Sequence, residues 1–136
     1  MLDGFRFHLS HAAPNGEPYR NHLQPDISDA SLTAEIGGVG ADFILCGHTH
    51  LPMFREIESR IFVNPGSVGL PLDGVPHASY ALYQDGKIKL RRARYDVDKT
   101  IRKLRRSTLP DDAVERLAEI LRTGRNVNVT IPSTST

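Results

Sequence analysis

The sequence of 136 residues lacks features that several classes of protein require. It contains one cysteine, Cys46, so no disulfide can form within the chain, which is compatible with a reducing compartment. No apolar run approaches the roughly 18 residues of a membrane span, and the first residues show neither the basic segment nor the long apolar segment of a signal peptide. We therefore expect a soluble, cytoplasmic protein that does not bind a membrane.

The sequence also lacks an excess of positive or negative charge, because its formal net charge is +1. Charged residues make up 24% of the chain and hydrophobic residues 39%. This composition excludes disordered, fibrous and strongly charged classes of protein. A chain of this length can bury the core of one domain but is too short for two ordinary domains. We expect one domain over residues 1–125 and a flexible tail over residues 126–136.

Local charge is uneven despite the balanced total. Residues 87–106 contain ten basic residues and only two acidic ones, a local net charge of +8. Such a block can attract phosphate-bearing partners such as nucleic acid. A solvated strand face followed by a solvated helix face explains the block as well. We favour this second interpretation because aromatic residues that could stack on bases do not alternate with the cations of the block, in which Tyr95 is the single aromatic residue.

The pattern of apolar residues predicts a mixed α/β fold. We expect strands at residues 5–9, 42–46, 53–57 and 60–63, and a hairpin that pairs residues 79–83 with 87–90 across an Asp-Gly turn. Helices are expected at residues 28–37, 97–106 and 111–122, with Gly124 just beyond the last one.

Three short segments with reactive or polar side chains each follow a predicted strand. They are Ser10-His11-Ala12-Ala13-Pro14, Gly47-His48-Thr49-His50 and Asn64-Pro65-Gly66-Ser67-Val68-Gly69. In open α/β sheets, ligands bind beyond the carboxyl ends of strands. Neutral imidazole is a frequent ligand of transition metals, and two histidines one residue apart can direct their nitrogens into one region. The second segment therefore predicts a metal site. The glycine-rich third segment could bind an anion through its backbone N–H groups and Ser67.

Together, these three segments resemble the final motifs of the calcineurin-like metallophosphoesterases, in their compact prokaryotic phosphodiesterase branch. Their order, separations and strand contexts agree with that branch, and the resemblance covers nearly the whole chain. It implies an α/β fold that corresponds to the C-terminal half of a metallophosphoesterase-like β-sandwich with flanking helices. One departure is Ala12, where the branch usually has a glycine after the histidine.

The resemblance also implies a ligand set and a substrate class. His11 and His48 would belong to one ion of a two-metal centre and His50 to the other. The implied metals are manganese, iron, zinc or magnesium, and imidazole ligands favour a transition metal over calcium. The candidate residues for binding the phosphate of a phosphate-ester substrate are Asn64, Gly66 and Ser67.

The motifs that usually precede these segments in the family do not occur in this sequence: Asp-x-His at a strand end, a Gly-Asp segment, and Gly-Asn-His-Asp or Gly-Asn-Cys-Asp. The bridging aspartate, the asparagine ligand and the catalytic histidine thus have no counterpart, and we identify no catalytic residue. In one hypothesis, the chain carries part of the site of a metal-dependent phosphodiesterase or phosphatase. In the alternative, it is a catalytically inert metal-binding or interaction module derived from that fold.

A chain that forms only half of a β-sandwich is expected to expose strand edges and apolar faces that the other half would cover. We expect open strand edges and uncovered apolar faces at residues 5–9 and 43–46. The chain is therefore expected to associate with a missing N-terminal segment or with a second copy of itself.

Overall fold

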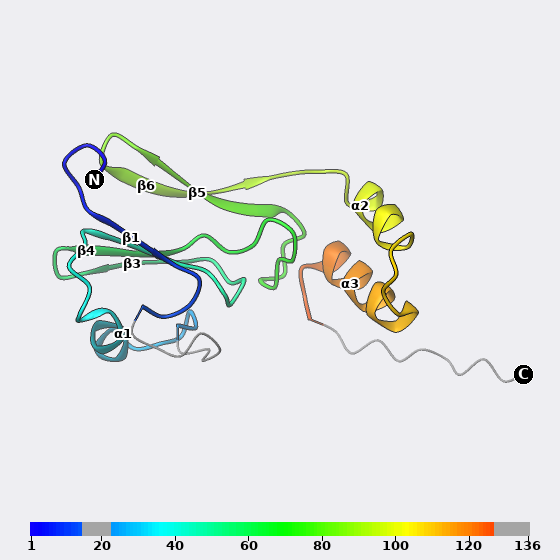
Figure 1. Cartoon of the computed structure of the whole chain (residues 1–136), viewed down its shortest axis with the longest axis horizontal. Coiled ribbons are helices and arrows are strands. Elements are labelled where there is room, and N and C mark those ends of the chain that lie inside the picture. The colour runs from blue at the N-terminus through cyan, green and yellow to red at the C-terminus, as the bar shows by residue number, and fades with distance from the viewer. Residues whose placement is uncertain (15–22, 127–136) are drawn as a thin grey trace, which may run out of the picture.

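The chain forms a mixed α/β fold in a computed structural model that describes residues 1–14 and 23–126 (Figure 1). In this part of the chain the strands are β1 (Phe7–Ser10), β2 (Phe43–Cys46), β3 (Met53–Ile57), β4 (Arg60–Asn64), β5 (Ala78–Gln84) and β6 (Lys87–Ala93). The helices are α1 (Asp29–Ile36), α2 (Val97–Leu104) and α3 (Asp111–Thr123). The expected tail lies outside the described residues, apart from Asn126.

A four-stranded sheet in the order β1-β2-β4-β3 places the segments predicted to carry the site. Strands β1, β2 and β4 run parallel, whereas β3 runs antiparallel to β4. The carboxyl ends of three strands therefore lie at one edge of the sheet. The segments that begin at His11, Gly47 and Pro65 leave the sheet at this edge.

Both faces of this sheet are covered by elements of the same chain (Figure 1). Strand residues alternate between faces, so Ile44 packs toward helix α1 while Phe43 and Leu45 pack toward the β5–β6 hairpin. Phe43 is 2% exposed and Ile44 is fully buried. The expectation of uncovered faces and an open edge at residues 43–46 is therefore wrong, because β2 lies between β1 and β4 and between two apolar layers.

Strand β1 starts later than the apolar pattern predicts. Asp3 and Gly4 adopt positive φ angles of 51° and 83°, and the turn they form lets Leu2 and Phe5 exchange both backbone hydrogen bonds. This local bridge removes Phe5 from the sheet. β1 remains an edge strand, as expected, and Leu9 is 73% exposed.

The hairpin and the terminal helices follow the sequence pattern closely. Asp85 and Gly86 form the predicted turn, with φ angles of 50° and 73°. Helices α2 and α3 pack on each other through a small apolar core, and Gly124 ends α3 at a φ of 68°. The N–H of Gly74 donates to the carbonyl of Gly124 over 2.8 Å, which ties the end of α3 to the loop before β5. No helix in residues 1–14 and 23–126 is long and apolar enough to cross a bilayer.

Candidate metal centre

The first two segments of the site are held together by their backbones. The N–H of Gly47 donates to the carbonyl of His11 over 3.0 Å, directly beyond the pair Ser10 and Cys46 at the ends of β1 and β2. This bond continues the parallel pairing by one step. His11 and His48 are consequently neighbours, although 37 positions separate them in the sequence.

The side chains of His11 and His48 meet at a distance that suits a shared ion. Nε2 of His11 lies 3.3 Å from Nδ1 of His48, with the two rings edge to face. Two imidazole nitrogens bound to one zinc-sized ion at about 2.1 Å, in tetrahedral geometry, would be about 3.4 Å apart. The separation of these two nitrogens is therefore close to that of two ligands of one ion, and it is also within hydrogen-bond distance.

His50 is oriented by the third segment. Its Nδ1 lies 2.8 Å from the carbonyl oxygen of Leu70. A carbonyl only accepts hydrogen bonds, so Nδ1 carries a proton, and in the neutral ring the lone pair is then on Nε2. Metal-binding histidines typically donate their second ring N–H to such a partner, which fixes the tautomer. His50 is thus prepared to bind a metal through Nε2.

The backbone of the Gly-His-Thr-His segment is strained. The N–H of Thr49 donates to the carbonyl of Gly47 over 2.9 Å, which closes a three-residue γ-turn around His48 at a φ of 70°. A γ-turn with positive φ is the rare and strained form. His50 also has a positive φ, of 60°. Strained residues of this kind cluster at functional sites.

Asn64 braces this strained turn from the end of β4. It is fully buried, and its Nδ2 donates to the carbonyl of Gly47 over 2.8 Å and to Oγ1 of Thr49 over 2.9 Å. Its Oδ1 accepts from the N–H of Gly66 over 2.9 Å. The amide therefore connects the second segment to the third. The assignment of Asn64 to phosphate binding stays a prediction, and its polar atoms already have partners within the protein.

The glycine-rich segment is anchored in the same way. Gly66 has a φ of 80°, and a Cβ at this position would lie 2.9 Å from Oγ of Ser79. The hydroxyl of Ser67 accepts from the N–H of Leu70 over 3.0 Å, and the carbonyl of Ser67 accepts from the N–H of Ser79 over 2.9 Å. This turn therefore positions the carbonyl of Leu70 that orients His50.

The ligand set in the described residues is incomplete for a metal centre. Within residues 1–14 and 23–126, no three His, Cys, Asp or Glu side chains form a group that could hold an ion. The structure brings His11 and His48 together, whereas His50 stands apart from that pair. Cys46, although next to the site in sequence, is 2% exposed, and its burial raises the pKa of the thiol.

Sequence reasoning missed two contributors to this site. One is the carbonyl of Leu70, which no residue pattern identifies because any residue has one. The other is the bracing role of Asn64, which depends on the register between β2 and β4. The position of Asn64 at a strand end was a signal, but it pointed equally to a ligand contact.

The family assignment follows from comparison with known proteins. Residues 1–85 match the family described as the calcineurin-like phosphoesterase superfamily domain. The chain belongs to this superfamily. The family resemblance in the sequence is thus confirmed, and the superfamily implies the use of divalent metal ions.

Two curated relatives come from archaea. The uncharacterized protein MJ0912 of Methanocaldococcus jannaschii is 31% identical over 133 residues, which cover 85% of this chain and 52% of the relative. A probable metallophosphoesterase of Methanothermobacter thermautotrophicus is 48% identical over 33 residues, which cover 24% of this chain and 19% of the relative. The chain spans about half the length of MJ0912.

Two solved structures share the fold. A metallophosphoesterase from Sphaerobacter thermophilus superposes with a TM-score of 0.74 at 24% identity, over 91% of this chain and 58% of that one. The hypothetical protein PH1004 from Pyrococcus horikoshii superposes with a TM-score of 0.72 at 21% identity, over 89% and 47% respectively. The expected α/β fold of metallophosphoesterase type is confirmed.

Proposed function

We propose that this chain contributes the histidine part of a dinuclear metal centre in a phosphoesterase that hydrolyses a phosphate diester or monoester. The observation that carries the proposal is the 3.3 Å separation of His11 Nε2 and His48 Nδ1 at the carboxyl ends of two parallel strands. This separation matches two ligands of one ion, and membership of the phosphoesterase superfamily supplies the reaction class.

Each histidine has a defined part in this function. His11 and His48 would hold one ion, and His50 would bind the second through Nε2, with its Nδ1–H held by Leu70. Manganese, iron, zinc or magnesium, when bound, supplies an activated hydroxide and neutralises charge on the phosphate. Asn64 positions both ligand segments by bracing their backbones.

The described residues do not supply the remaining ligands of the centre. MJ0912 and PH1004 are each about twice as long as the region that they share with this chain. We propose that a further segment or a second copy supplies carboxylate ligands and adds to the free edge of β1, and that the assembled protein acts in the cytoplasm. If a second copy supplies these ligands, light scattering at micromolar concentration would give a mass above that of one chain.

Calorimetric titration with Mn²⁺ and Zn²⁺ tests the metal site directly, without relying on activity. The chain should bind about one equivalent weakly, because an incomplete set of neutral ligands holds the ion. His48→Ala should abolish this binding. His77→Ala, which removes a histidine outside the three site segments, is the matched control and should bind like the wild type. Equal binding by the wild type and a His48→Ala/His50→Ala double variant would refute the proposal.

A further inference from the structure

The β5–β6 hairpin has an outer face that no described element covers. Its inner face packs on the core through alternate residues, among them Ile88 and Leu90. On the outer face, the register places Tyr80 opposite Arg91, Leu82 opposite Lys89, and Gln84 opposite Lys87. Tyr80 is 40% exposed and Leu82 is 45% exposed. The outer face is therefore an open β-surface with an aromatic ring at one end.

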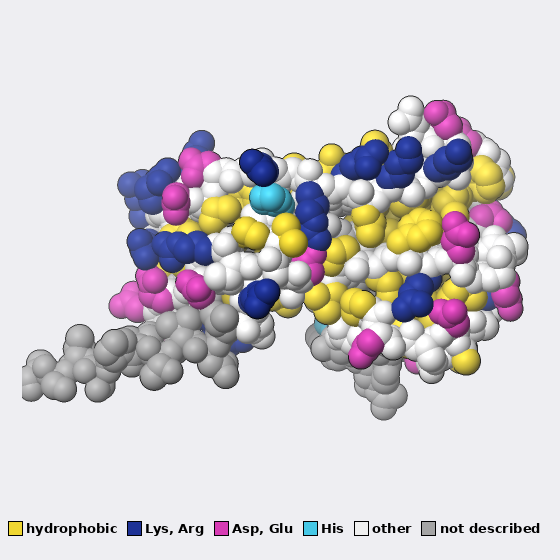
Figure 2. Space-filling view, turned by 180° about the vertical axis from the view of Figure 1, so that it is seen from behind, with side chains coloured by type: hydrophobic (Ala, Val, Ile, Leu, Met, Phe, Trp, Pro, Cys, Tyr) yellow, Lys and Arg dark blue, Asp and Glu magenta, His cyan; other side chains and the backbone are white. Residues whose placement is uncertain are grey.

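A row of cations without acidic partners runs along this face. Lys87, Lys89 and Arg91 are exposed, and none of them makes an ion pair with a described residue. Other arginines of the basic block are neutralised, in the pairs Arg92–Asp73, Arg102–Asp96 and Arg105–Glu115. Figure 2 shows Lys and Arg side chains gathered over the hairpin. Three of the unpaired cations of the block thus share one strand face, whereas Arg94, Lys99, Lys103 and Arg106, which also lack an ion pair with a described residue, lie beyond the hairpin.

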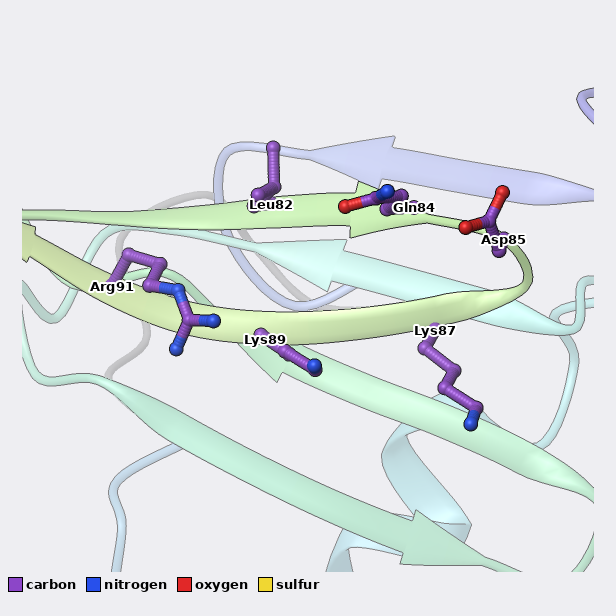
Figure 3. A pocket seen from close by; sticks show the side chains of 6 residues that line it. All are labelled: Leu82, Gln84, Asp85, Lys87, Lys89 and Arg91. Carbon is purple, nitrogen blue, oxygen red and sulfur yellow. The ribbon is translucent and has the colours of Figure 1, made fainter.

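The same cations border a shallow hollow. Its volume is about 270 Å³, and Figure 3 shows the side chains that line it: Leu82, Gln84, Asp85, Lys87, Lys89 and Arg91. The three cations leave β6 in order along one side of the strand (Figure 3). Asp85, in the turn, is the single carboxylate among these lining residues. The hollow is therefore suited to a flexible anion of several charges.

We propose that the outer face of the β5–β6 hairpin, with Lys87, Lys89, Arg91 and Tyr80, is a docking surface for single-stranded nucleic acid. Cations on alternate residues of a strand recur every ~6.8 Å, close to the separation of neighbouring phosphates in an extended single strand. A base can stack on the exposed ring of Tyr80 while its phosphates follow the cations, which is how single-strand-binding surfaces combine charge and stacking.

This surface is independent of the metal centre. Its residues lie on β5 and β6, whereas the histidines follow β1 and β2. A single strand is favoured over a duplex because the bases of a duplex are stacked on each other and cannot reach Tyr80. It is favoured over a lipid surface because Leu82 is the single aliphatic side chain that lines the hollow.

Fluorescence anisotropy with a labelled twelve-nucleotide oligothymidine tests the charge row. Three phosphate contacts predict a slope of about −2 in a plot of log affinity against log salt. Lys87→Glu/Lys89→Glu should weaken binding at least about tenfold. Lys99→Glu/Lys103→Glu, which reverses two exposed unpaired lysines on α2, is the matched control with the same change in net charge and should weaken binding less than about threefold.

The stacking step has its own test. Tyr80→Ala should weaken binding about fivefold or more, whereas Tyr80→Phe should retain it. Circular dichroism melting of each variant verifies that it is folded. Equal losses in the two charge-reversed variants would overturn the proposal. So would equal binding of a twelve-base-pair duplex or of phosphatidylserine vesicles, or wild-type affinity in Tyr80→Ala.

Discussion

Replacing Asn64 by alanine is the sharpest test of how the candidate metal centre is built. The substitution removes three hydrogen bonds, from Nδ2 to Gly47 and Thr49 and from the N–H of Gly66 to Oδ1. Each bond contributes about 1 kcal/mol net, and the partners left behind lose buried contacts as well. We expect the free energy of unfolding to fall by about 3 kcal/mol, a large fraction of the total for a domain of this size.

Urea unfolding followed by circular dichroism measures this change. The midpoint should fall while the slope of free energy against urea stays constant, because the surface exposed on unfolding is the same. Ser67→Ala is the matched control, since it removes one bond from the same loop, and it should cost about 1 kcal/mol. Asn64→Asp should be at least as harmful as Asn64→Ala, because a buried carboxylate would face the Gly47 carbonyl.

The competing interpretation gives a different result. If Asn64 mainly contacts substrate phosphate, its loss would leave folding almost unchanged and reduce only phosphate binding. An unfolding free energy of Asn64→Ala within about 0.5 kcal/mol of the wild type would therefore refute the bracing role.

Three further predictions concern the same region. Gly66→Ala should destabilise the fold by about 1–2 kcal/mol in the same urea assay, because the new Cβ would lie 2.9 Å from Ser79 Oγ at a φ of 80°; unchanged stability would mean that this turn is pliable. Burial raises the pKa of the Cys46 thiol, so its alkylation by iodoacetamide at pH 8 should be at least about tenfold slower in the folded chain than in urea. A folded chain that alkylates as fast as the unfolded one would contradict this account. By linkage, the raised pKa of Cys46 favours the folded state below the ordinary pKa of a thiol, and this contribution to stability is lost as the pH rises beyond that value. The chain alone should hydrolyse bis-p-nitrophenyl phosphate poorly, since no three His, Cys, Asp or Glu side chains among the described residues form a group that could hold an ion; strong metal-dependent turnover that is lost in His48→Ala would show that the ligand set is complete in solution.

The parts of this fold that were predictable depend on short-range signals. Ser28 caps helix α1 through its hydroxyl, and the Asp85-Gly86 turn closes the hairpin, as their residue types indicate. The meeting of His11 with His48 was also predictable. It follows from the rule that the carboxyl ends of parallel strands share one edge of a sheet.

The parts that were not predictable depend on contacts between distant segments. The aromatic residue beside the cations of β6 comes from the neighbouring strand, where Tyr80 pairs with Arg91. A search within residues 87–106 could not find it, because the partner is set by the hairpin register. The burial of β2 was missed for a related reason: its cover comes from helix α1 and from the hairpin, which are far apart in the sequence.

The strain at His48 and His50 links the fold to the proposed chemistry. A non-glycine residue in a left-handed conformation costs about 1–2 kcal/mol, so two of them would relax in an isolated loop. Here the cost is offset by the hydrogen bonds of Asn64 on either side of His48 and by the bond that Nδ1–H of His50 donates to the carbonyl of Leu70. The folded core therefore braces the backbone at His48 and orients the ring of His50. A site held this way loses little of its metal-binding free energy to the ordering of its own ligands. Loosening Asn64 should therefore weaken metal affinity, through its bonds to Gly47, Thr49 and Gly66.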